Sequence, residues 1–211
     1  MVNKSTDRDR DPEKKQQPSW LDYIRKTDAE LLKLCRVDTF RGSGKGGQKR
    51  NKTSNAVRLT LFDIAVTESA ARSRALNINH ALRKLRVSIA LNSSRLFDRS
   101  AAHGSFPEEI QPYLFQGIIR IQPQNPVFPV YIGCLVDLFI QYKGSWSGIS
   151  LRYGVSNSQL RRFVGKHPAL SQTLERIRKE WVEDGFPCQA PVGEKPPLPA
   201  RGDSEEDGSI S

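Results

Sequence analysis

Residues 41–53 read RGSGKGGQKRNKT, and the rest of the chain is organised around this segment. Four of its glycines fall within six residues, so the backbone can adopt positive φ and approach another molecule closely. Its tip, Gly46-Gly47-Gln48, presents one neutral amide side chain. The flanking cations are Arg41, Lys45, Lys49, Arg50 and Lys52. A glycine-rich segment with an uncharged tip and basic flanks favours insertion into polyanionic surroundings.

Three simpler interpretations compete with that one. Gly-rich basic segments are often linkers or solvated turns. A phosphate-binding P-loop requires G-x-x-x-x-G-K-[ST]; residues 42–47 have the glycine spacing, but Gln48 and Lys49 replace its Lys and Ser/Thr. A disordered RNA tether is the third alternative, although the residues that follow have the pattern of folded structure.

A longer pattern carries more information than the glycines alone. Residues 41–53 follow R-x-S-G-x-G-G-Q-x-x-N-K-T, with AVRL at 56–59 and RS at 72–73. Together they resemble the catalytic domain of class-I peptide chain release factors, and also the short, codon-independent homologues that rescue stalled ribosomes. The resemblance covers about residues 34–91.

The resemblance implies a mechanism and a set of partners. A Gln side chain is no base at neutral pH but can orient water, so the chemistry is positioning. By resemblance, Gly46, Gly47 and Gln48 are catalytic: the main-chain N–H of Gln48 meets the transition state of peptidyl-tRNA hydrolysis. The partners implied are peptidyl-tRNA and large-subunit rRNA at the peptidyl transferase centre. A glutamine methyltransferase is implied as well, acting on N5 of Gln48.

Charge is concentrated in the same region. Between Arg36 and Arg86 there are twelve Lys/Arg and three Asp/Glu, which accounts for most of the chain's net charge of +10. We therefore expect RNA contacts from the basic residues of the segment and from others beyond it. The full set is Arg41, Lys45, Lys49, Arg50, Lys52, Arg58, Arg72, Arg83, Lys84 and Arg86. For the last three, a solvated helix face is the alternative.

No cofactor or metal site is expected. Cys35, Cys134 and Cys188 are far apart and odd in number, so they indicate reduced thiols rather than disulfides or a zinc site. The histidines are scattered too. No apolar run of 18 residues and no signal-peptide pattern is present. We expect a cytoplasmic monomer without membrane contact.

The first structured region is predicted over residues 18–91. Residues 1–17 are polar and expected to be disordered. Ser19 and Thr27 are predicted to cap two short helices, the second with Glu30 in a capping box. Strands are expected at 35–37, by the resemblance, at 55–61 and at 64–67. A helix then starts at Ser73, with Leu76, Ala81, Leu82, Leu85 and Ile89 on its apolar face.

A second structured region is predicted after a connector. Residues 92–129 hold five prolines, so we expect a surface connector with one ordered piece at 113–121. Residues 130–182 should form a helical unit, in which ISLRYGVSNSQLRRF (149–163) has the form of a helix-turn-helix. Arg161 and Arg162 could touch phosphate there. Residues 183–211 carry seven acids and two bases and are expected to be disordered.

The predicted fold class is therefore α+β: a small release-factor-type domain with a short sheet on a helix, then a helix-turn-helix-like unit, with disordered termini. The chain departs from the family in two ways. Nothing before residue 41 has the length or composition of a stop-codon-reading domain, and the tail is acidic where rescue homologues carry a basic one. We expect codon-independent release activity. A catalytically silent rRNA-binding module and a DNA-binding regulator remain as alternatives.

Overall fold

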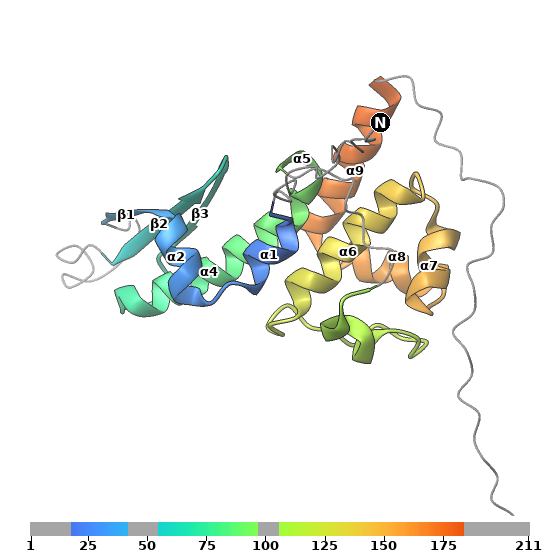
Figure 1. The fold of residues 1–211 in the computed structure, drawn as a ribbon, viewed down its shortest axis with the longest axis horizontal. Coiled ribbons are helices and arrows are strands. Elements are labelled where there is room, and N and C mark those ends of the chain that lie inside the picture. The colour runs from blue at the N-terminus through green and yellow to red at the C-terminus, as the bar shows by residue number, and fades with distance from the viewer. Residues whose placement is uncertain (1–17, 42–54, 97–105, 184–211) are drawn as a thin grey trace, which may run out of the picture.

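The computed structural model describes residues 18–41, 55–96 and 106–183 (Figure 1). A small sheet lies at one end, a group of helices at the other, and the long helix α4 runs between them. The predicted α+β class is confirmed. The elements are α1 (Trp20–Arg25), α2 (Asp28–Leu34), β1 (Arg36–Phe40), β2 (Ala56–Leu61), β3 (Ile64–Glu68), α4 (Arg74–Leu91), α5 (Ser93–Leu96), η2 (Glu108–Tyr113, a 3-10 helix), α6 (Phe128–Gln141), α7 (Trp146–Tyr153), α8 (Asn157–Gly165) and α9 (Pro168–Glu183).

Both N-terminal helices begin with a capping box. The Thr27 hydroxyl accepts from the Glu30 backbone N–H, and the Glu30 carboxylate accepts from the Thr27 backbone N–H at 2.9 Å, as predicted. Ser19 and Asp22 make the same reciprocal pair at α1. Each box satisfies N–H groups that a short helix otherwise leaves without partners.

The sheet is antiparallel in the order β1-β2-β3. Val57, Leu59 and Leu61 are buried while Arg58 is exposed, which is the alternation expected of a strand with one buried face. The turn between β2 and β3 is tight, and Phe62 adopts a φ of 53° there. The buried face packs on α4.

Helix α4 begins after Ser73, as predicted, and buries Ala81, Leu82, Leu85 and Ile89. Leu76 was expected on the same face, but its side chain is half-exposed at 50%. Leu76 lies in the first turn of α4. It fits the apolar periodicity of the helix, but its side chain is not covered by another element. The C-terminal half of α4 leaves the sheet and packs against α6 (Figure 1).

The segment between the two regions is more deeply buried than its prolines suggested. Ile110 in η2 is fully buried, and Leu114 and Ile121 are nearly so. The ordered piece is the 3-10 helix η2, which spans Glu108–Tyr113 and so overlaps the interval expected at 113–121 only at Tyr113. The expectation of a purely surface-running connector was wrong because its apolar side chains reach the core that surrounds α6.

The C-terminal helices contain the predicted helix-turn-helix. α7 ends at Gly154, whose φ of 65° suits a residue without Cβ, and Ser156 caps α8 by accepting from the Gln159 backbone N–H. Leu160 and Phe163 point into the core. The Tyr153 hydroxyl donates to the Tyr131 carbonyl at 2.8 Å and so ties α7 to α6.

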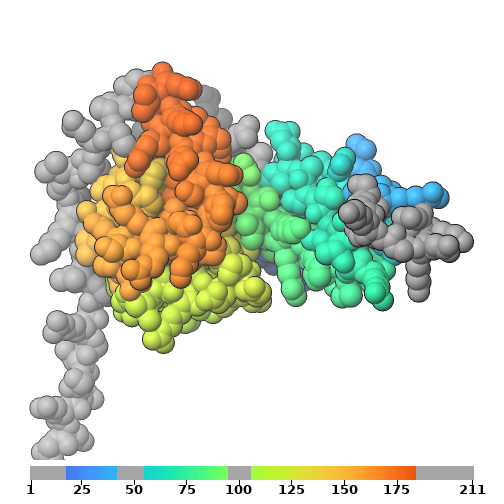
Figure 2. Space-filling model, turned by 180° about the vertical axis from the view of Figure 1, so that it is seen from behind, coloured from blue at the N-terminus to red at the C-terminus, as the bar shows by residue number. Residues whose placement is uncertain are grey.

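The two ends of the molecule share one hydrophobic core. Trp20 of α1 lies against Gly133 of α6, and its indole N–H donates to Asp137 at 2.9 Å. Seen from behind, α6–α9 form a broad mass that continues without a break into α4 and the sheet (Figure 2). None of the described helices is both long and apolar enough to cross a membrane.

Candidate functional site

Strands β1 and β2 frame the glycine-rich segment. Phe40 and Ala56 are paired across the two strands, so the chain leaves the sheet and returns to it at neighbouring positions. Arg41 follows β1 directly and is exposed. Residues 42–54 lie outside the described residues. They include the predicted catalytic Gly46, Gly47 and Gln48, and the predicted RNA contacts Lys45, Lys49, Arg50 and Lys52.

A buried amide fixes the start of β2 in place. Asn77 of α4 is fully buried, and its Nδ2 donates to the carbonyls of Asn55 at 2.7 Å and Ala71 at 3.0 Å. Its Oδ1 accepts from the Ala71 N–H at 2.9 Å. Asn55 in turn donates to the Arg72 carbonyl at 2.8 Å. These bonds join Asn55, the residue directly before β2, to the turn before α4.

Asn77 is not among the predicted site residues, although the sequence contains a signal for it. Asn77 precedes Ala81 by four residues and Leu85 by eight, so it occupies the apolar face of α4. A polar residue at such a position has to be hydrogen-bonded, since an unpaired buried amide costs about 1–3 kcal/mol. A buried Asn on this face therefore indicates that its amide bonds to backbone groups of a neighbouring segment.

A second buried polar group lies at the end of β3. The Glu68 carboxylate is 8% exposed, and Lys84 Nζ lies 2.6 Å from it. The backbone N–H groups of Ser69 and Ala70 also donate to it, each at 3.0 Å. Lys84 chiefly, and these N–H groups after it, lower the pKa of Glu68 to about 2. Lys84, one of the predicted RNA contacts, therefore has an anionic partner within the protein.

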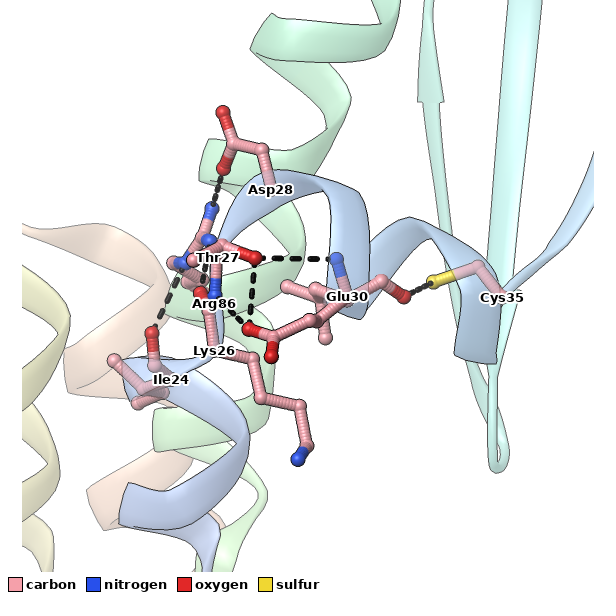
Figure 3. A network of polar contacts seen from close by, with 8 residues as sticks. Ile24, Lys26, Thr27, Asp28, Glu30, Cys35 and Arg86 are labelled. Carbon is pink, nitrogen blue, oxygen red and sulfur yellow. Dashed lines mark hydrogen bonds and ion pairs between the residues drawn. The ribbon is translucent and has the colours of Figure 1, made fainter.

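Arg86 is held inside the protein (Figure 3). Its guanidinium donates to the carbonyl oxygens of Ile24 at 3.1 Å and Lys26 at 2.7 Å, and pairs with the Asp28 carboxylate at 2.6 Å. Its side chain is only 14% exposed. Arg86 thus fastens the link between α1 and α2 onto α4. An RNA contact by Arg86 stays a prediction, and it competes with this role.

The other predicted RNA contacts are exposed but not gathered on one side. Arg58 lies on the sheet face opposite α4, with its guanidinium 5.7 Å from the centre of the Phe40 ring. Arg83 is exposed on α4, the helix that packs against the other face of the sheet, and Arg72 is exposed in the turn before α4. The exposed cations therefore lie at several places around β1, β2 and α4 rather than in one patch.

Among the described residues no group of three His, Cys, Asp or Glu side chains could hold a metal ion. Cys35 and Cys134 are free thiols, whereas Cys188 lies outside the described ranges. Burial raises the pKa of the Cys35 thiol. The part of the chain that the structure describes therefore offers polar and cationic groups, but no candidate metal centre.

Comparison with known proteins gives the class of this site. Residues 27–112 match the model of the RF-1 domain, so this part of the chain is a domain of the class-I release factor family. The match includes β1, β2, β3, α4 and the glycine-rich segment between the first two strands.

The curated relatives are release factors. Peptide chain release factor 2 of Caulobacter vibrioides is 42% identical over 76 residues, which is 35% of this chain and 20% of the relative. Peptide chain release factor 1 of Chlamydia trachomatis is 35% identical over 111 residues, 48% of this chain and 29% of the relative. Release factor 2 of Lactiplantibacillus plantarum is 29% identical over 126 residues, 51% of this chain. The chain spans a third or less of each relative, and no solved structure matches it.

Proposed function

We propose that this protein binds the ribosome and triggers hydrolysis of peptidyl-tRNA through Gly46-Gly47-Gln48, without reading a stop codon itself. The observation that carries the proposal is the RF-1 domain match, because it spans this tripeptide and the strands on either side of it. The protein acts in the cytoplasm, where it releases nascent chains from ribosomes that have stalled or are terminating.

The chemistry required is the placement of water beside an ester. The carbonyl oxygen gains negative charge as water attacks, and a backbone N–H directed at that oxygen stabilises it. Two glycines before Gln48 allow the backbone to come this close. The Gln48 side chain orients the water but takes no proton, so large-subunit rRNA supplies the surrounding site. N5-methylation of Gln48 by a glutamine methyltransferase would adjust this amide.

The framework of the domain supports such a role. β1 and β2 pair Phe40 with Ala56, and Asn77 secures Asn55 to α4. Such a root holds the residues on either side of the glycine-rich segment at fixed points, and correct placement of a reacting group accounts for much of the rate in reactions of this kind. Arg41, Arg58 and Arg72 would meet rRNA phosphate around that root.

The test is peptide release from purified ribosomes that hold peptidyl-tRNA, with each codon and an empty site compared. Gln48→Ala should reduce release at saturating protein by about 100-fold or more, as expected when a group that acts on the transition state is removed. Gln172→Ala is the matched control, because Gln172 is exposed on α9. Equal release by wild type and Gln48→Ala would overturn the proposal, and release at the background rate by both would favour a catalytically silent rRNA-binding module.

A DNA-binding regulator is the second candidate, and the α7–Gly154–α8 geometry is the observation that favours it. In that case α8 would lie in the major groove of duplex DNA. Replacing both Arg161 and Arg162 by Ala would then abolish binding to an operator sequence while leaving release unaffected.

A further inference from the structure

The stretch of sequence that contains α7 and α8 carries positive charge without negative charge. No Asp or Glu occurs between Asp137 and Glu175, a stretch that includes all of α7 and α8. Arg161, Arg162 and Lys166 lie in that stretch and are exposed. No ion pair within the described residues involves any of these three. Exposed cations are usually mixed with carboxylates on a solvated surface, so their isolation here requires an explanation.

The packing of α8 gathers its polar groups on one side. Leu160, Phe163 and Val164 are buried against the core, and the residues between them face outward. We call this outward side the α8 face; it consists of Asn157, Ser158, Arg161, Arg162 and Lys166. Every one of these side chains can donate a hydrogen bond and none carries a negative charge.

Arg161 is oriented by an aromatic ring. Its guanidinium lies 5.4 Å from the centre of the Trp146 ring, at the start of α7. Such stacking restricts the side chain but leaves its charge and its N–H groups available. An arginine held in this way loses little conformational entropy when it binds a phosphate with two parallel N–H donors.

We propose that the α8 face binds the phosphate backbone of structured RNA, as a second contact on the same RNA that the RF-1 domain approaches. This inference rests on the proposed function. The two regions are joined rigidly: α4 packs on α6, and Trp20 of α1 is fixed to Asp137 of α6. A ligand that binds the RF-1 domain therefore meets α8 at a set position.

The geometry of RNA determines how α8 can bind it. The major groove of an A-form helix is deep and narrow, so α8 cannot enter it as it could enter the major groove of DNA. The side chains of Arg161, Arg162 and Lys166 can instead lie along phosphates, with Asn157 and Ser158 near the 2′-hydroxyl groups. Such contacts give strong salt dependence and little sequence preference.

Binding of the full-length protein to a fluorescein-labelled RNA hairpin tests this, with the DNA hairpin of the same sequence in parallel. Arg161→Ala with Arg162→Ala should weaken RNA binding about tenfold or more at physiological salt. The slope of log K against log salt should fall in magnitude by about 1.4–1.8, since each phosphate contact contributes about 0.7–0.9. Arg161→Lys with Arg162→Lys retains the charges and should retain most of that slope.

The matched control is Arg178→Ala with Lys179→Ala, which removes the same charge from exposed positions on α9. An equal loss in this control would show diffuse electrostatic attraction and overturn the inference. Tighter binding of wild type to the DNA hairpin than to the RNA hairpin would overturn it as well, in favour of DNA reading. Unchanged melting temperatures of all variants establish that the fold is intact.

Failure of this inference is separable from failure of the proposed function. The α8 variant is Arg161→Ala with Arg162→Ala. If this variant releases peptide at the wild-type rate at saturating protein concentration, but needs a higher concentration to reach it, the α8 face acts in binding as proposed. If it binds RNA and ribosomes normally while Gln48→Ala abolishes release, only the α8 inference falls. If Gln48→Ala is harmless and the α8 variant still loses RNA binding, only the hydrolytic function falls.

Discussion

Replacing Gly133 by Ala tests whether α1 fixes the sheet end of the molecule to the helical end. An ideal Cβ on Gly133 would lie 2.4 Å from Cη2 and 2.5 Å from Cζ3 of Trp20. These distances are far below van der Waals contact, so the ring has to move. The ring is 5% exposed and its N–H is bonded to Asp137 at 2.9 Å. Moving it therefore disturbs both the packing and that hydrogen bond.

The expected cost follows from these contacts. Overpacking a core costs about 1–3 kcal/mol, and a weakened hydrogen bond to a carboxylate adds about 1 kcal/mol or more. Ala recovers about 1 kcal/mol because it favours helix over Gly. We expect Gly133→Ala to lower the free energy of unfolding by about 2 kcal/mol. For a protein of this size the melting temperature should fall by about 4–8 °C, which calorimetry or circular dichroism can measure.

Two further variants isolate the cause. Gly165 is the last residue of α8, and no heavy atom lies within 4 Å of an added Cβ, so Gly165→Ala should be neutral or slightly stabilising. Trp20→Leu should be destabilising alone but less so beside Gly133→Ala, because the clash is then gone. A Gly133→Ala protein that melts with the wild type, or effects of Trp20→Leu and Gly133→Ala that simply add, would refute the close packing of α1 on α6.

Three other predictions concern the polar groups around α4. The pKa of Glu68 is about 2 in the folded protein against 4.5 ordinarily, so its ionised form stabilises the fold above about pH 4.5, and this stability is lost as the pH falls toward 2. In Glu68→Gln, the free energy of unfolding from urea titrations should therefore fall by about 1–2 kcal/mol less than in the wild type over that pH range. Asn77→Ala should lower the free energy of unfolding, measured by chemical denaturation, by roughly 2–4 kcal/mol because it leaves backbone groups unpaired. Asn79→Ala, at an exposed position of the same helix, should lower it by under about 0.5 kcal/mol. Arg86→Lys should lower the free energy of unfolding by about 1–3 kcal/mol, since an ammonium cannot reproduce the forked contacts, while Arg83→Lys should leave it unchanged. Similar melting temperatures of the two variants would contradict the role of Arg86 in holding the α1–α2 link on α4.

The features that could be predicted from the sequence are those that neighbouring residues determine. The Thr27–Glu30 capping box, the turn at Gly154 and the alternation along β2 each depend on groups a few residues apart. The burial of Ile110 and the exposure of Leu76 depend on which distant element covers them. Helical or proline-rich patterns do not contain that information, and both expectations failed for this reason.

In the candidate site too, local sequence features could be predicted and features that depend on tertiary packing could not. The residue types around Gly46-Gly47-Gln48 and their order were sufficient to indicate the class of domain, which the family match supports. The roles of the cations on α4 were not predictable in the same way. Arg83 and Arg86 are three residues apart and have the same chemistry, yet Arg83 is exposed while Arg86 is bound to carbonyl groups of the α1–α2 link. Which cation is available depends on where that link lies.

Rigidity between the two ends has a functional consequence that composition alone would not suggest. Arg86 binds the α1–α2 link to α4, Trp20 binds α1 to α6, and the Tyr153–Tyr131 bond ties α7 to α6. A displacement of α8 would therefore be carried through α6 and α4 to the sheet whose strands β1 and β2 flank the glycine-rich segment in the sequence. Because Asn77 holds Asn55, the residue before β2, to α4, a partner held by α8 would also set the position of the strand that follows the glycine-rich segment. The α8 face would then raise the affinity for the ribosome, while the rate of release at saturation would stay that of the wild type when α8 is altered.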